Sequence, residues 1–119
     1  MKKYNNSNIK ALNTFGINTI IKSLIIIENY DELKQIFEEG IFKDKFFILG
    51  GGSNVLFLDN FDGHVIKVDL KGNEINPLGN NVIVTSYAGE NWDDLVKMVV
   101  DKGYGGMENL SLIPGSVGA

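Results

Sequence analysis

KFFILGGGSN, residues 45–54, is the stretch of sequence that decides the fold. The apolar run 45–49 predicts a short buried strand, which three glycines end sharply. Upstream, residues 20–27 are dense in β-branched side chains, which is typical of a strand buried on both faces. Between the two strands, Asn29 caps a predicted amphipathic helix that ends before Gly40. Strand, helix and strand in this order predict a parallel βαβ unit.

The second half of the chain predicts a different kind of lobe. A boundary near residues 71–73 divides the chain into a first lobe, 1–70, and the beginning of a second lobe, 71–119. Residues 77–81 have the composition of a β-hairpin turn. Asn91 then caps a predicted helix, and the apolar stripe of this helix consists of Trp92, Leu95, Val96 and Val99. The expected fold class is therefore α+β, with a small parallel βαβ lobe followed by the start of a mainly antiparallel lobe.

Three segments carry weaker patterns. Residues 1–18 are polar and lack a sustained period, so we expect an extended arm. Residues 65–68 predict a third strand after the turn at 59–63. Residues 104–119 are rich in glycine and predict a loop.

The composition excludes several classes of partner. The chain has 119 residues and a net charge of −4, so no electrostatic attraction to nucleic acid or to an anionic membrane is expected. It contains no cysteine, which excludes disulfides and thiolate metal sites, and no metal site is expected elsewhere. The polar start lacks the apolar core of a signal peptide, and no run is long enough to cross a bilayer, so we expect a cytoplasmic protein.

The glycine loop stands where open α/β sheets bind ligands, at the carboxyl end of a predicted parallel strand. Glycines allow backbone N–H groups to approach an anion, and Ser53 and Asn54 add uncharged donors. A pyrophosphate would suit such a loop. The loop differs from the Rossmann fingerprint because Val55 stands at the third glycine position, and it lacks the lysine of a Walker loop. A plain chain reversal is an equally open reading of these residues alone.

A second glycine cluster spans residues 105–118. Pro114 fixes φ and Gly115 can supply the positive φ that follows, so residues 113–116 predict a type II turn that presents N–H groups. An ordinary surface loop is the alternative.

Other polar residues predict no chemistry. His64 is the only histidine and has no apparent serine or carboxylate partner, so we expect a surface or edge position and no catalytic triad. Asp93 and Asp94 predict a solvated helix face. Trp92 is expected to pack in the core.

Several segments together resemble one family, the UDP-N-acetylenolpyruvoylglucosamine reductases. The matching segments are residues 13–16, 48–57, 88–92, 106–110 and 113–118. The glycine loop alone resembles only the wider flavoprotein group that includes vanillyl-alcohol oxidase. Five segments in the same order and spacing are far more specific, and they cover nearly the whole chain.

The resemblance implies a site for FAD between the two lobes. The implied cofactor-binding residues are Leu49, Gly50, Gly51, Gly52, Ser53 and Asn54 around the pyrophosphate, and Pro114, Gly115, Ser116 and Gly118 over the flavin. In this family FAD takes hydride from NADPH and passes it to the enolpyruvyl group of a UDP-sugar, which gives UDP-N-acetylmuramate for peptidoglycan synthesis. The resemblance therefore implies an oxidoreductase.

The sequence departs from the family in one respect. It contains no arginine, and the catalytic arginine, serine and glutamate of the family would all lie beyond Ala119. Glu90, Glu108 and Ser111 are therefore not assigned to those roles, and no catalytic residue is expected in this chain. We expect a fragment without turnover, with weak FAD retention, and with exposed apolar surface that favours self-association. The alternatives are a non-catalytic FAD- or nucleotide-binding module and part of another flavin oxidase.

Overall fold

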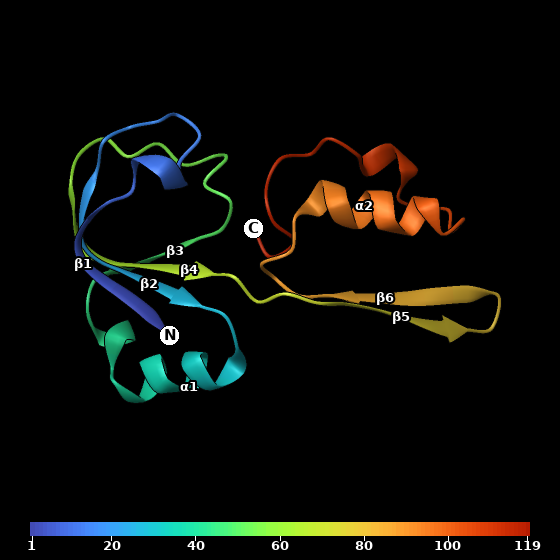
Figure 1. Ribbon diagram of the computed structural model, residues 1–119, viewed down its shortest axis with the longest axis horizontal. Coiled ribbons are helices and arrows are strands. Elements are labelled where there is room, and N and C mark those ends of the chain that lie inside the picture. Colours follow the sequence, from blue (N-terminus) through green and yellow to red (C-terminus); the bar gives the residue numbers. More distant parts are fainter.

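A computed structural model describes residues 1–119 and arranges them as two bodies (Figure 1). The strands are β1 (Lys2–Asn8), β2 (Ile20–Ile27), β3 (Phe46–Leu49), β4 (Phe61–Val68), β5 (Asn73–Leu78) and β6 (Asn81–Ser86), and the helices are α1 (Tyr30–Glu38) and α2 (Trp92–Asp101). We call β1–β4 with α1 the sheet body, and β5, β6 and α2 the hairpin body. The Cα radius of gyration is 16.6 Å, against about 13–14 Å for a compact chain of this length, because the hairpin body projects to one side.

The sheet body confirms the predicted βαβ unit. Its strand order is β1-β2-β4-β3, and both β2 and β3 run parallel to β4. The connection from β2 through α1 therefore returns to the same sheet with β4 inserted between the two strands. The prediction of a third strand at 65–68 is confirmed, although β4 begins earlier, at Phe61.

The expected extended arm at residues 1–18 is wrong for its first part. β1 pairs antiparallel with β2 over the register Lys2–Ile26 to Asn8–Ile20. Its side chains are almost all exposed, which suits a polar edge strand, and this polarity hides the strand from periodicity. A short 3-10 helix, Lys10–Leu12, follows it.

Apolar side chains fill both faces of the four-stranded sheet. One cluster lies between the sheet and α1 and consists of Ile25, Ile27, Ile36, Ile41 and Ile66. The other lies on the opposite face and consists of Ile9, Ile21, Leu24, Leu49 and Val65. Each fully buried aliphatic side chain stabilises the fold by about 1.5–3 kcal/mol, so the central strands β2 and β4 hold the body together.

Helix α1 begins as the sequence predicts. The Asn29 side chain accepts a hydrogen bond from the Glu32 N–H at 3.0 Å, and the Glu32 carboxylate accepts one from the Glu28 N–H at 2.7 Å. The first bond satisfies an N–H group that the helix itself leaves unpaired, and the second joins the first turn of the helix to the residue after β2.

Replacing Asn29 with alanine should lower the free energy of unfolding by about 1 kcal/mol, because the cap bond to Glu32 is lost. Urea denaturation followed by circular dichroism measures the change. The control is Asn29→Ser, whose hydroxyl can still accept from the helix and which should cost much less. Equal losses in both variants would contradict a capping role.

The hairpin body differs from the sequence prediction in detail. β5 and β6 pair antiparallel up to Leu78 and Asn81, so the turn is only two residues long and Pro77 lies inside a strand. An edge strand tolerates proline because one of its sides has no ladder bonds to lose. Asn91 caps α2 as expected, accepting from the Asp94 N–H at 3.1 Å. The expected core position of Trp92 is wrong in part: the ring is only half-buried, and its indole N–H donates to the Leu110 carbonyl at 2.8 Å.

The prediction for His64 is also wrong. The residue is 5% exposed in the central strand β4. Its Nδ1 lies 2.6 Å from the Ser23 hydroxyl, and its Nε2 lies 3.2 Å from the Asp44 carboxylate. The hydrogen bond from His64, followed by that from Lys22, lowers the pKa of Asp44. Parallel pairing of β2 with β4 places Ser23 opposite His64, a register that the linear sequence does not reveal.

Neither helix has the length and apolar composition needed to cross a membrane.

Candidate functional site

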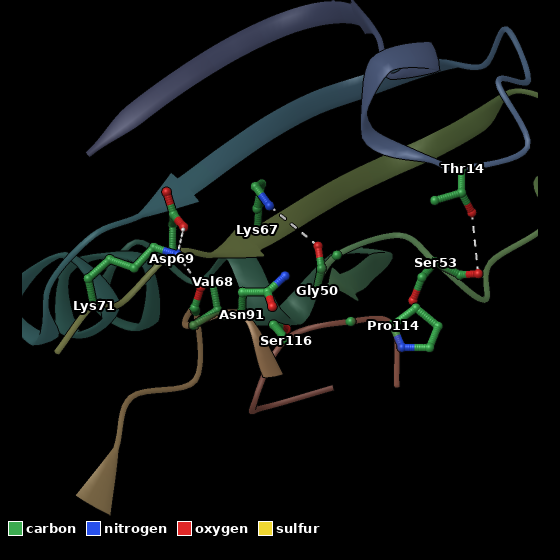
Figure 2. Close-up of a pocket in the computed structure, with 13 residues that line it drawn as sticks. Thr14, Gly50, Ser53, Lys67, Val68, Asp69, Lys71, Asn91, Pro114 and Ser116 are labelled. Carbon is green, nitrogen blue, oxygen red and sulfur yellow. Dashed lines mark hydrogen bonds and ion pairs between the residues drawn. The ribbon is translucent and has the colours of Figure 1, made fainter. Parts of the chain in front are cut away.

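A polar cleft of about 360 Å³ lies where the two bodies meet (Figure 2). The sheet body and its connection contribute Thr14, Gly50, Gly51, Ser53, Lys67, Val68, Asp69 and Lys71, and the later segments contribute Gly89, Asn91, Pro114, Gly115 and Ser116. The ends of β3 and β4 therefore form one wall, and the C-terminal segment forms the other.

Glycines allow these two walls to come together. A Cβ atom at Gly51 would lie 3.4 Å from the Gly115 Cα, and one at Gly50 would lie 2.9 Å from the Ser116 Oγ. The two predicted glycine segments thus lie next to each other. A side chain at Gly50 would overlap Ser116 and Ala119, whereas a Cβ atom at Gly51 would only touch the backbone of Gly115.

The glycine loop is anchored from behind by the segment after the 3-10 helix. Gly52 has a φ of +67°, and a Cβ atom there would lie 1.9 Å from the Leu12 carbonyl oxygen. The Thr14 N–H donates to the Gly52 carbonyl at 3.1 Å, and the Thr14 hydroxyl donates to the Ser53 carbonyl at 3.3 Å. These bonds engage carbonyl groups of the loop and leave its N–H groups free.

Free N–H groups are the main chemical feature of the cleft, where Gly50, Gly51 and Ser53 of the loop line it together with Gly115 and Ser116. None of the five N–H groups of residues 50–54 donates a hydrogen bond within the chain, and neither do those of Gly115 and Ser116. Backbone N–H groups left without acceptors are costly when they are enclosed, and they form a favourable site for an anion. Glycine contributes here because its backbone can approach a ligand closely.

Lysines add positive charge to the same cleft. Lys67 extends its Nζ toward the Gly50 carbonyl, 3.4 Å away (Figure 2). Lys71 instead pairs with Asp69 at 3.3 Å and donates a hydrogen bond to the Gly89 carbonyl. Neither lysine is predicted from the sequence. The signal that could have found them is their place at the end of the strand beside the glycine loop.

A family comparison indicates which ligand the domain binds. Residues 22–119 match the family described as FAD binding domain. The chain belongs to the FAD-binding domain family. FAD carries a pyrophosphate, and the free N–H groups and lysines of the cleft fit such a group. The predicted cofactor is thereby confirmed, and so is the α+β fold of the flavoprotein type.

Relatives of this FAD-binding domain have one recurrent name. The chain is 45% identical over 119 residues to the UDP-N-acetylenolpyruvoylglucosamine reductase of Flavobacterium johnsoniae, covering 99% of the chain and 35% of the relative. It is 44% identical over 115 residues to the enzyme of that name from Salmonella typhimurium, covering 93% and 33%. The crystal structure of a UDP-N-acetylenolpyruvylglucosamine reductase from Thermus caldophilus superposes with a TM-score of 0.67 at 26% identity, covering 98% of this chain and 39% of that one.

The resemblance predicted from the motifs is therefore confirmed. The chain spans about a third of the length of the curated relatives that it matches, 35% of the first of them.

Only some of the expected FAD-binding residues line the cleft. Those that line the cleft are Gly50, Gly51, Ser53, Pro114, Gly115 and Ser116. Gly52 and Asn54 line a neighbouring cavity that shares Gly50, Gly51, Ser53, Pro114 and Gly115 with the cleft. The Leu49 side chain is buried in the core, so only its backbone could contact FAD. A Cβ atom at Gly118 would lie 2.5 Å from the Ala88 Cβ, so this glycine serves chain packing.

The expected turn at residues 113–116 is displaced. Gly115 has the predicted positive φ, +123°. The hydrogen-bonded turn lies three residues later, where the Ala119 N–H donates to the Ser116 carbonyl at 3.1 Å. The Gly115 carbonyl is held instead by the Trp92 N–H at 3.1 Å, which joins the C-terminal segment to the start of α2.

The Asp93 carboxylate makes specific hydrogen bonds, whereas the sequence predicts that it lies on a solvated helix face. Its carboxylate accepts hydrogen bonds from the Leu112 N–H at 2.6 Å and from the Ser111 hydroxyl at 2.8 Å. The bond from Leu112, followed by that from Ser111, lowers the pKa of Asp93 from its ordinary value of 3.8. This carboxylate thus fixes the loop that leads to Pro114 in the cleft.

A lowered carboxyl pKa predicts a specific pH dependence. The stabilisation by Asp93 is fully present above pH 3.8 and is lost as the pH falls through the lower pKa of the folded state. The Asp93→Asn variant should therefore show a flatter dependence of unfolding temperature on pH below about 4. The control is Asp94→Asn, because the Asp94 side chain accepts no hydrogen bond and its replacement should leave the profile unchanged. Identical profiles in all three proteins would contradict the anchoring role.

Proposed function

We propose that the chain forms the FAD-binding part of a UDP-N-acetylenolpyruvoylglucosamine reductase and holds the FAD pyrophosphate in the cleft. The observation that carries the proposal is the set of N–H groups without acceptors at Gly50, Gly51 and Ser53, which line one cleft together with Gly115 and Ser116. The relatives at 45% and 44% identity carry the name of that reductase, which supports the choice of enzyme.

The two walls of the cleft are proposed to bind different parts of FAD. Gly50, Gly51 and Ser53 are proposed to bind the pyrophosphate through their N–H groups, and Pro114 to Ser116 to lie over the flavin. A first lobe at 1–70 and a second at 71–119 remain part of the proposal. It is supported by the separate hydrogen-bonded sheets, since β1–β4 and β5–β6 share no ladder.

We assign no catalytic residue to this chain. Three acidic or hydroxyl side chains already have structural roles: Glu90 accepts from the Gly72 N–H, Glu108 from the Gly106 N–H, and Ser111 donates to Asp93. Their engagement supports the view that hydride transfer from NADPH to the UDP-sugar is a property of the whole reductase. Peptidoglycan synthesis, a cytoplasmic location and self-association of the chain stay predictions.

Titration of FAD with the purified chain tests the proposal. Flavin fluorescence should change in a saturable manner, and ADP should compete because it carries the same pyrophosphate. The proposal would be refuted if binding does not saturate at protein concentrations up to about 1 mM. A Kd of that size corresponds to a binding free energy of roughly −4 kcal/mol. NADPH oxidation that depends on the UDP-sugar would refute the assignment of no catalytic residue.

A further inference from the structure

We propose that Lys67 supplies the positive charge that binds the pyrophosphate of FAD in this cleft. The inference rests on the proposed function and adds to it a charged residue that none of the glycine motifs contains. It concerns a binding residue, with no part in hydride transfer.

The side chain of Lys67 has no anionic partner. Several other lysines pair with carboxylates: Lys71 with Asp69, Lys22 with Asp44, Lys2 with Glu28 and Lys34 with Glu38. No carboxylate oxygen lies within 4.0 Å of the Lys67 Nζ, although the residue is half-buried. The ammonium group is therefore free to pair with an anionic ligand in the cleft, where it would form a charge-assisted hydrogen bond.

The position of Lys67 in the sheet also favours this role. β3 and β4 pair in parallel with Leu49 opposite Lys67, so the lysine stands beside the residue from which the glycine loop begins. The only hydrogen bond of its side chain is a long one, 3.4 Å, to the Gly50 carbonyl. This contact holds the side chain against the loop and leaves most of its donor capacity free.

Lys67 is also the only charged side chain of the cleft lining whose charge is not balanced by another one. Lys71 is neutralised by Asp69, and the loop contributes N–H dipoles that carry no net charge. A diphosphate brings two negative charges into this space. Lys67 is then the one full charge in the lining that is free to offset them, and charge-assisted bonds are the stronger ones.

The test compares FAD affinity of the wild-type chain with that of Lys67→Gln by flavin fluorescence, at two salt concentrations. Lys67→Gln should bind FAD about tenfold more weakly, and its affinity should depend less on salt because one ionic contact is gone. Lys67→Arg keeps the charge and should retain affinity and salt dependence. The matched control is Lys43→Gln, which removes one charge at the opposite end of β3, away from every cleft residue.

The outcomes separate this inference from the proposed function. If the wild-type chain binds FAD and Lys67→Gln binds it equally well, the inference about Lys67 is overturned and the proposed function stands. The inference is also overturned if affinity falls while the salt dependence stays unchanged, since that is the result of a purely structural role. If the wild-type chain shows no saturable FAD binding, both fail together.

Discussion

The Gly52→Ala variant is expected to lose about 3–5 kcal/mol of unfolding free energy, a large part of the 5–15 kcal/mol that a domain typically has. The added methyl group would lie 1.9 Å from the Leu12 carbonyl oxygen and 2.9 Å from its carbon. Both are backbone atoms, so no side-chain rotation relieves the clash, and the loop or the 3-10 helix must move. Urea denaturation measures the loss.

The matched control for this prediction is Gly16→Ala. Gly16 has nearly the same φ, +64° against +67°, and nothing lies within 4 Å of the Cβ position. The Gly16→Ala variant therefore introduces the strain of a left-handed non-glycine residue, about 1 kcal/mol, without the clash. The difference between the two variants isolates close packing of the glycine loop. Similar losses in both would show that conformation alone, and no contact with Leu12, requires glycine at position 52.

Gly89→Ala is expected to cost about 2–3 kcal/mol of unfolding free energy and to weaken FAD binding at least tenfold. A Cβ atom there would lie 2.6 Å from the Cα and carbonyl carbon of Asp69, and the Gly89 N–H donates to the Leu70 carbonyl at 2.9 Å. The clash is thus between backbones at the junction of the two bodies. Because Gly89 lines the cleft, moving this junction also displaces the walls of the proposed FAD site.

Denaturation and FAD titration together check this second prediction. The control is Gly105→Ala, since the nearest atom to a Cβ there is the Glu108 Oε1 at 4.0 Å and the glycine has no positive φ. That variant should match the wild type in both measurements. Unchanged FAD affinity in a destabilised Gly89→Ala would mean that the junction does not set the cleft geometry.

The features that sequence could predict are those with local causes. Asn29 and Asn91 cap their helices through bonds that reach only three residues along the chain. The glycine loop follows a strand directly, so its place at the edge of the sheet follows from the strand itself. Such short-range causes are written into spacing and composition.

The features that sequence missed depend on residues far apart in the chain. His64 meets Ser23 across 41 positions only because β2 and β4 pair in one particular register. Asp93 binds the Leu112 N–H across 19 positions, through a loop that has no period. Lys67 belongs to the cleft because it pairs with Leu49 in the neighbouring strand. Each contact requires the three-dimensional arrangement of strands and loops.

The contact of buried Ser23 and His64 with exposed Asp44 bears on how hydrolase sites are recognised. In a serine hydrolase the serine bonds to Nε2 of the histidine and the aspartate to Nδ1. Here the order is reversed, and the serine is 1% exposed, so no substrate carbonyl could reach its oxygen. A geometric template that asks only for the three residue types within hydrogen-bond reach would identify this flavin domain as an esterase. Which ring nitrogen meets the serine, and whether the serine oxygen faces solvent, distinguish the two.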